Sequence, residues 1–531
     1  MKKQTSILRY FRRDDFGGSP PRRMALLVNP PVYDTQYWAE WAQPYGLLRI
    51  AALLKQYRYK RVELFDFMEA DASRNVHQHR INPDEGYGEG DEPTRPIKPI
   101  VIEKGGQSLE LFKYHFGKTW QEFDQWLDAR GFTAKHPPHE VWISAVMTYW
   151  WESVRDLIAR LRRRFGKRTT ILLGGIYPTL VPQHAARMTG ADIVVAGEVA
   201  AANDLWTDLS FYKRKPEYAI ITPSRGCPFN CAYCAQRKLN GDRKQVRYRQ
   251  PDDILAEMKD KHNRYGIRDF AFYADYLLVN YRHCLMPILK GIVNQKLPFR
   301  LHAPEGFDTR TLSQSQELVD LLKAARLERV YLPLEHFDNE RLKGLNRTHV
   351  KIGHFVQAVR MCEKAGYRLR NMQVNAFVLY GLPGETIDEV VKTTLFVSHT
   401  VGSVIPMLFT PVPGTAIYEQ YLPYFRERGW HRDLHMLNGK LFPFLHMNEG
   451  GVDDYVDVQR LMYTLNAHYR SKSFSIFGDT RVAAAFRSNI GNGFAGWIAA
   501  AAREVIPLPE TENGQAILGG ARNGAISRRH R

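Results

Sequence analysis

The chain has 531 residues, of which 44% are hydrophobic and 12% aromatic, enough apolar material for the cores of about two or three domains. This composition excludes a disordered chain, and no run of about 18 apolar residues predicts a membrane span. The net charge of +18 is compatible with a nucleic-acid partner, but no aromatic-rich basic motif favours one. Residues 1–20 are basic without the apolar core of a secretory signal, so we expect a mobile tail on a cytoplasmic protein.

The next part of the chain alternates short apolar strands with helices, which predicts a doubly wound parallel sheet over residues 21–205. The expected strands are residues 24–31, 61–67, 140–147, 169–175 and 192–196. The expected helices are residues 46–57, 151–165 and 184–188. Residues 70–135, rich in His, Gly, Pro and charge, break this rhythm, so we expect an insertion that is partly helical between Leu109 and Ala129.

A second alternating series predicts a partial (β/α)6 barrel over residues 206–425. The expected strands are residues 219–222, 269–273, 299–302, 329–334, 374–380 and 404–409. In such a barrel the chemistry gathers at the carboxyl ends of the strands. Residues 426–531 are expected to be mostly helical, with a disordered tail.

Three of the five cysteines, Cys227, Cys231 and Cys234, follow the first barrel strand with the spacing CxxxCxxC. A disulfide framework would spread its cysteines, so this cluster indicates a metal. Three thiolates on one loop can bind three irons of a 4Fe–4S cluster and leave the fourth iron open. Zinc is the weaker alternative, because it normally takes four protein ligands. Cys284 and Cys362 lie in helical patterns and are expected in the core.

With Tyr233 before its last cysteine, this motif resembles the signature of the radical S-adenosylmethionine (SAM) superfamily, and the resemblance covers the whole expected barrel. It implies that the open iron binds the amino and carboxylate groups of SAM. It also implies that an electron, supplied to the cluster by a donor such as flavodoxin or ferredoxin, cleaves SAM to a 5′-deoxyadenosyl radical.

The resemblance implies further SAM contacts at the ends of later strands. Asp275 stands where the family has an acidic pair near the methionine amino group, and Ala274 replaces the other acid. Glu335 ends the fourth strand and is expected at the ribose or the amino-acid end of SAM. A Gly-x-x-Gly loop beside adenine is expected at Gly381, Gly384 and Glu385. For each acid, a helix cap or a solvated turn is the alternative.

The first domain resembles cobalamin-binding domains. Ser144 ends one strand and the pair Gly174 and Gly175 ends the next, at a spacing similar to the elements that surround the nucleotide tail of cobalamin. The resemblance implies that these residues and Thr148 bind cobalamin. No His lies within residues 29–44, so the resemblance is to the radical members that bind cobalamin without a protein His on cobalt. The alternative is a domain that keeps the fold without the cofactor.

The expected activity is therefore that of a radical SAM enzyme that uses cobalamin for methyl transfer to an unactivated carbon of a small molecule. One alternative is the same architecture catalysing a radical cyclisation, rearrangement or oxidation without methyl transfer. The other is a basic RNA-modifying protein. No residue is assigned a catalytic role beyond cofactor binding, and the sequence identifies no substrate.

Overall fold

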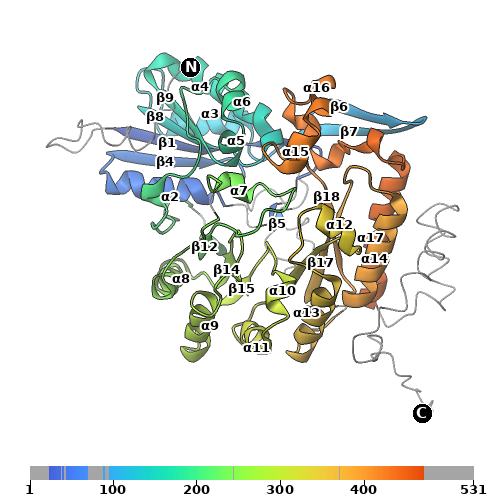
Figure 1. The fold of residues 1–531 in the computed structure, drawn as a ribbon. Coiled ribbons are helices and arrows are strands. Elements are labelled where there is room, and N and C mark those ends of the chain that lie inside the picture. Colours follow the sequence, from blue (N-terminus) through green and yellow to red (C-terminus); the bar gives the residue numbers. More distant parts are fainter. Residues whose placement is uncertain are drawn as a thin grey trace, which may run out of the picture. The chain divides into compact units, whose positions relative to one another are not determined.

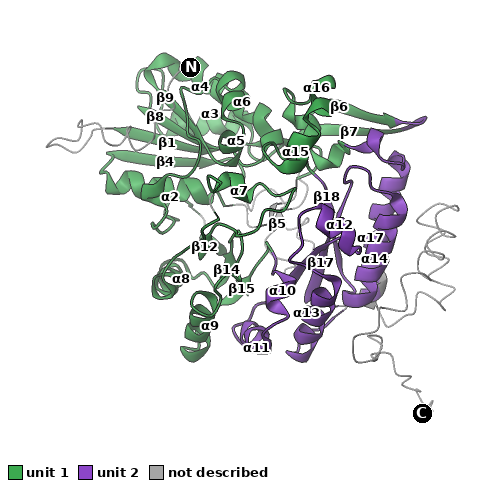
Figure 2. Cartoon of the chain, in the orientation of Figure 1, with its two compact units in different colours: residues 1–103, 108–305, 410–443 green, residues 104–107, 306–409, 444–531 purple. Residues whose placement is uncertain are grey.

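The computed structural model describes residues 23–37, 39–40, 43–69, 88–89, 95–213, 215–242, 244–369 and 371–471. The chain forms two compact units (Figure 2), of which unit 1 holds residues 1–103, 108–305 and 410–443 and unit 2 holds residues 104–107, 306–409 and 444–531. The expected N-terminal and C-terminal tails lie outside the described residues, as does much of the insertion before residue 95. Among the described residues, no helix is both long and apolar enough to cross a membrane.

Unit 1 contains the first expected sheet, with five parallel strands in the order β4-β1-β8-β9-β10 (Figure 1). Its strands are β1 (Met24–Asn29), β4 (Arg61–Asp66), β8 (Glu140–Ser144), β9 (Thr170–Gly174) and β10 (Ile193–Val194). The connecting helices include α2 (Tyr45–Gln56), α4 (Trp151–Phe165), α5 (Ile176–Leu180) and α6 (Pro182–Met188). Strand β4 lies on one side of β1, and β8, β9 and β10 follow in turn on the other side. The direction in which strands are added to the sheet therefore reverses between β1 and β8.

The six strands of the second series are also present, in two three-stranded parallel sheets. Unit 1 holds β11 (Tyr218–Ile221), β14 (Asp269–Phe272) and β15 (Arg300–His302). Unit 2 holds β16 (Val330–Glu335), β17 (Val374–Tyr380) and β18 (Val404–Leu408). The helices between them include α8 (Pro251–Tyr265), α9 (Leu285–Asn294), α11 (Gln316–Ala324), α13 (Ile352–Lys364) and α14 (Ile387–Val401). The fold is therefore α/β, while the union of the two sheets into one barrel stays a prediction.

The C-terminal region is helical as far as it is described, and it divides between the units. Helices α15 (Ala416–Gln420) and α16 (Leu422–Glu427) belong to unit 1, and α17 (Val452–Ser471) packs beside α14 in unit 2. Residues 410–443 return to the first sheet domain, where Asn438 donates a hydrogen bond of 2.9 Å to the buried Asp34. The sequence patterns predict the helices but do not predict this return.

The insertion differs from the expectation. Residues expected to be helical from Leu109 form the strand β7 (Gln107–Phe116), which lies between β2 (Val32–Asp34) and β6 (Arg95–Lys104), and only α3 (Trp120–Ala129) is a helix. The prediction was wrong because half-buried Leu109 and Leu111 alternate with exposed neighbours, a period of two that suits a strand. A capping box between Thr119 and Glu122 begins the helix.

Three of the six basic residues in the densest basic run, residues 160–168, are ion-paired within unit 1. Arg160, Arg162 and Arg164 form ion pairs with Asp124, Asp192 and Asp128, respectively. These pairs reduce the charge that the run could offer to a nucleic-acid surface. Cys284 and Cys362 are buried, with 4% and 0% of their surface exposed, which confirms that they are core residues.

Candidate active site

Cys227, Cys231 and Cys234 lie on one half-buried loop of unit 1, between β12 (Ser224–Arg225) and α7 (Gln236–Leu239). The Cys234 N–H donates a hydrogen bond of 3.1 Å to the Cys231 carbonyl, which closes the loop. Burial, with smaller contributions from the nearby Cys231 and Cys227 groups, raises the pKa of the Cys234 thiol to about 12. The three thiols are thus close enough to interact, and Cys234 needs the positive charge of a bound metal to become a thiolate.

The loop fits a multi-iron cluster better than a single metal ion. A structural zinc site needs four Cys, His or carboxylate ligands around one point, and residues 227–234 carry three cysteines and no other such side chain. In a 4Fe–4S cluster each thiolate binds a different iron, so three thiolates on one loop and one open iron satisfy its chemistry.

The backbone just before the first cysteine is tightly constrained. Gly226 has a φ of +104°, and a Cβ there would lie 2.6 Å from the Gln245 carbonyl oxygen. Its N–H donates a hydrogen bond of 2.6 Å to Asp275 Oδ2, which also accepts one of 3.0 Å from Asn240. Asp275 therefore positions the cysteine loop, while its expected contact with the amino group of SAM stays a prediction.

Glu198, just beyond β10, ties the five-stranded sheet to the cysteine loop. Its carboxylate accepts hydrogen bonds of 3.3 Å from Arg225 and 2.6 Å from Arg247, which pair with each other across β12 and β13 (Arg247–Tyr248). Burial alone would raise the pKa of Glu198, but hydrogen bonding by Arg247 and the charge of Arg225 hold it below its usual value. The spacing of these residues in the sequence does not indicate this link.

Other contacts of the loop come from segments far away in the sequence. The Ile417 N–H donates a hydrogen bond of 3.1 Å to the Ala232 carbonyl, so the segment that returns after the last strand supports the loop. Phe229 packs edge-on against Tyr276, with ring centroids 5.2 Å apart. Helix α7, which follows the last cysteine, contacts helix α5, which begins directly after Gly175. The cysteine loop is therefore a neighbour of the glycine pair within unit 1.

The residues expected at cobalamin share one edge of the five-stranded sheet. Ser144 and Gly174 are opposite each other at the ends of β8 and β9. Beside them, Val146, Met147 and Ile176 have 41%, 39% and 37% of their surface exposed. This edge thus presents apolar surface to solvent. Thr148, by contrast, is only 4% exposed, so it supports the edge from inside.

The two positions of the glycine pair differ in how much space a side chain would have. A Cβ on Gly175, at φ +106°, would lie 2.4 Å from the Ala145 carbonyl oxygen, so the chain itself requires glycine there. A Cβ on Gly174 would meet only Val195, at an ordinary 3.7 Å. The fold thus does not require glycine at 174, and the open space beside it could receive a ligand.

In unit 2, the expected SAM residues share the carboxyl edge of two neighbouring parallel strands. Glu335 ends β16 at a register shift, with a φ of +65°, and its carboxylate lies 2.5 Å from Arg347 Nε. Both side chains are 9% exposed. A left-handed Glu beside a bulge at a strand end is typical of a functional position, because the fold bears strain to hold it there.

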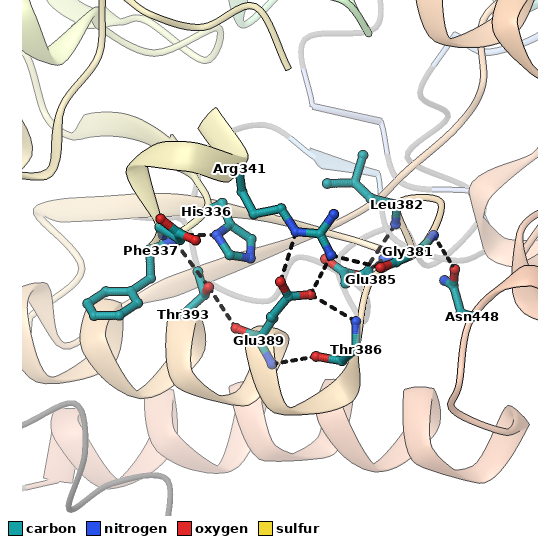
Figure 3. A network of polar contacts seen from close by, with 12 residues as sticks. His336, Phe337, Arg341, Gly381, Leu382, Glu385, Thr386, Glu389, Thr393 and Asn448 are labelled. Atoms are coloured by element: carbon teal, nitrogen blue, oxygen red, sulfur yellow. Dashed lines mark hydrogen bonds and ion pairs between the residues drawn. The ribbon is translucent and has the colours of Figure 1, made fainter. Parts of the chain in front are cut away.

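The loop after β17 is held from inside by Glu385, which is 2% exposed. Its carboxylate accepts hydrogen bonds from the N–H groups of Gly381 at 2.6 Å and Leu382 at 3.3 Å (Figure 3), and burial raises its pKa to about 8. From outside, the Gly384 carbonyl accepts a hydrogen bond of 2.7 Å from Arg341, and the Gly384 N–H donates one of 2.9 Å to Asn448. We expect Glu385 to act on a bound nucleotide through the loop backbone.

Comparison with known proteins identifies the family of the region that carries the cysteine loop. Residues 221–397 match the family model of the radical SAM superfamily. This region therefore carries a radical SAM domain.

Individual relatives of this chain are distant. Bacteriochlorophyllide d C-12(1)-methyltransferase of Chlorobaculum tepidum is 22% identical over 58% of this chain and 73% of its own length. The tRNA-2-methylthio-N(6)-dimethylallyladenosine synthase of Desulforamulus reducens is 27% identical over 34% of this chain and only 39% of its own length. The solved structure of TsrM, a radical SAM methyltransferase from Kitasatospora setae with tryptophan and a SAM analogue bound, covers 76% of each chain at 17% identity and a TM-score of 0.51. This last likeness shows a shared fold.

One further residue of the radical SAM region stands out in the structure although no motif marks it. Glu305 follows β15 in unit 1, and its side chain is exposed. Desolvation nevertheless raises its pKa to about 7, with a smaller contribution from Asp275 in the same direction and an opposing one from Arg225. Glu305 is thus accessible to a ligand while lying among protein groups that also contact the cysteine loop.

Proposed function

We propose that this radical SAM protein is a cobalamin-dependent methyltransferase that acts on an unactivated carbon of a small molecule. Cys227, Cys231 and Cys234 would hold the 4Fe–4S cluster, and the edge at Ser144 and Gly174 would hold cobalamin. The observation that carries the proposal is the contact of α5 with α7, which brings the glycine pair and the cysteine loop together in one unit. Methyl transfer to a carbon radical requires such neighbours.

The sheet topology supports the cobalamin site. In open parallel sheets, ligands bind outside the carboxyl ends of the strands, where the strand order reverses. Here the order reverses between β1 and β8, and β8 ends at Ser144. We therefore propose that residues 21–205 form a Rossmann-like cobalamin-binding domain and that residues 206–425 form the partial (β/α)6 radical SAM barrel.

When bound, the cluster supplies the electron that cleaves SAM to a radical, and cobalamin supplies the methyl group. The chain supplies position and surroundings. Asp275 and Glu198 hold the cysteine loop through Gly226 and Arg225. Val146, Met147 and Ile176 offer apolar surface for the face of a flat macrocycle, and Gly174 leaves room for its tail.

In unit 2, the glycine loop after β17 suits the adenine ring of SAM. A Cβ on Gly384 would meet nothing within 4 Å, and one on Gly381 would meet only the Phe409 backbone at 3.9 Å. A flat ring can therefore approach this backbone closely. Glu335 is proposed at the ribose or amino-acid end, where Arg347 orients its carboxylate. We also propose that the protein acts in the cytoplasm and that a small electron donor such as flavodoxin or ferredoxin reduces its cluster.

RNA modification is the less favoured function. The tRNA-modifying relatives match 34–52% of this chain, against 58% for the bacteriochlorophyllide methyltransferase, and three of the six basic residues in the densest basic run pair with carboxylates. A small-molecule substrate is consistent with both observations, because it requires neither a tRNA-binding region nor a basic surface. A radical cyclisation, rearrangement or oxidation differs from the proposal by making no use of cobalamin, so retention of that cofactor decides between them.

The test is corrinoid retention by anaerobically reconstituted protein. Hydroxocobalamin is added during refolding, the protein is desalted, and the corrinoid and iron that co-elute are measured. Gly174→Val should lower corrinoid retention about tenfold or more, a loss of ~1.4 kcal/mol, and leave the iron content unchanged. Gly175→Val is not a clean probe, because its Cβ would displace the Ala145 backbone with or without a ligand.

The matched control is Gly353→Val on α13, where a Cβ meets nothing within 4 Å, and it should keep both cofactors. Wild-type protein that forms its cluster but retains no corrinoid would overturn the methyltransferase proposal in favour of a cobalamin-independent radical enzyme. Failure of a fully loaded cluster to release 5′-deoxyadenosine from SAM with a strong reductant would contradict radical chemistry altogether.

A further inference from the structure

The glycine loop after β17 is held by a residue from outside the region that matches the radical SAM family model. The Gly384 N–H donates its hydrogen bond of 2.9 Å to Asn448 Oδ1. Asn448 is 6% exposed, and its amide donates a second hydrogen bond, of 2.6 Å, to the Tyr455 hydroxyl. The matched region ends at residue 397, so Asn448 lies 448 − 397 = 51 residues beyond it. The position of Gly384 therefore depends on where Asn448 lies.

Asn448 is fixed in turn by the insertion. Residues 104–107, which connect β6 to β7, belong to unit 2. The Lys104 ammonium donates hydrogen bonds to three consecutive carbonyl oxygens, those of Asn448, of Glu449 at 3.3 Å and of Gly450 at 2.7 Å. An ammonium group has three N–H donors, so it can serve all three acceptors at once. Lys104 thus holds the backbone of the turn that carries the Asn448 side chain.

Packing leaves this turn little freedom to adjust. A Cβ on Gly451 would lie 1.9 Å from Gln107 Oε1, which also accepts a hydrogen bond of 3.3 Å from the Asp453 N–H. A Cβ on Gly450 would lie 2.6 Å from a side-chain carbon of Ile387, the first residue of α14. The turn is therefore packed between the insertion and the helix that follows the glycine loop, and close packing transmits a shift from one side to the other.

From these contacts we propose that Lys104 is a positioning residue for the adenine of SAM. Through the carbonyl groups of residues 448–450 it sets Asn448, and Asn448 sets Gly384. The assignment rests on the proposed placement of adenine at the glycine loop. It makes the insertion before the radical SAM domain a part of the SAM site, acting through the backbone rather than on the ligand itself.

The experiment measures equilibrium binding of two ligands to cluster-loaded protein: S-adenosylhomocysteine, and S-ribosylhomocysteine, in which a hydroxyl group replaces adenine. Lys104→Met keeps the length of the side chain and removes its donors. It should weaken S-adenosylhomocysteine binding about fivefold, as expected for about one hydrogen bond, and leave the affinity for S-ribosylhomocysteine unchanged. The matched control is Lys343→Met on α12 (Asn339–Gly344), where the side chain is 67% exposed, and it should bind both ligands like wild type.

Two further variants separate positioning from a general loss of stability. Asn448→Ala removes the acceptor of the Gly384 N–H, and adding Lys104→Met to it should cost little more, because both changes act through the same hydrogen bond. Lys104→Ala should regain S-adenosylhomocysteine affinity when propylammonium is added, since this cation can occupy the vacated space and donate to the same carbonyl groups.

The iron content of each variant should equal that of wild type, which separates ligand binding from cluster assembly. Equal weakening of both ligands, weakening of neither, full additivity in the double variant or failure of propylammonium to restore binding would overturn the assignment while leaving the proposed function intact. Wild-type cluster-loaded protein that binds neither SAM nor S-adenosylhomocysteine would overturn the proposed function and, with it, this assignment.

Discussion

Replacing Gly226 by Ala should displace the cysteine loop. The new Cβ would lie 2.6 Å from the Gln245 carbonyl oxygen, and ordinary contact begins at 3.4 Å, so the two backbones must separate by 3.4 − 2.6 = 0.8 Å. A shift of that size can lengthen the hydrogen bond of 2.6 Å from the Gly226 N–H to Asp275 to about 3.4 Å and so weaken it. The left-handed backbone costs a non-glycine residue about 1–2 kcal/mol, and the weakened hydrogen bond up to about 1 kcal/mol more. We therefore expect Gly226→Ala to cost about 1–3 kcal/mol and to lose most of its iron.

Gly241→Ala is the matched control. Gly241 follows α7 with a φ of +66°, and a Cβ there meets nothing within 4 Å, so it bears the backbone cost without the clash. The assay is iron per chain and cluster absorbance after anaerobic reconstitution, with denaturant unfolding of the cluster-free proteins for stability. The reasoning is refuted if Gly226→Ala keeps wild-type iron, or if Gly241→Ala loses as much iron as Gly226→Ala does.

Two further predictions concern the cluster ligands and the glycine loop. Changing any one of the three cluster cysteines to Ala should remove the brown absorbance and the iron, because thiolates are the iron ligands that the loop offers; about four irons in the triple variant would contradict this. For Glu385, the folded pKa of about 8 exceeds the usual 4.5, so its contribution is full below 4.5 and stability is lost as the pH rises from there to about 8. Glu385→Gln should flatten this part of the stability–pH curve in denaturant unfolding, and an unchanged slope would show that Glu385 is not the group responsible.

The cofactor sites depend on contacts that join distant parts of the chain. Glu198 reaches Arg225 and Arg247 across 27 and 49 residues of sequence, and Ile417 supports Ala232 from the segment that returns after β18. Through these contacts the first sheet and the returning segment both hold the cysteine loop.

Local patterns in the sequence by themselves determined most of the elements and the cluster ligands. Apolar runs bounded by turns predicted the five strands of the first sheet and all six strands of the second series, because burial on both faces leaves a continuous apolar signal. The three cysteines are recognisable because their loop is one contiguous stretch. The prediction failed at β7, where a period of two was interpreted as helical.

Only the tertiary structure decided which residues meet. Which strand ends share an edge depends on strand pairing, which places Ser144 opposite Gly174 at the ends of β8 and β9. Packing also showed that Gly175 serves the fold while Gly174 leaves open space, a difference that two adjacent glycines cannot reveal in sequence. The physical reason is that a motif records local chain geometry, whereas ligand contacts arise from side chains that the fold brings together from separate strands.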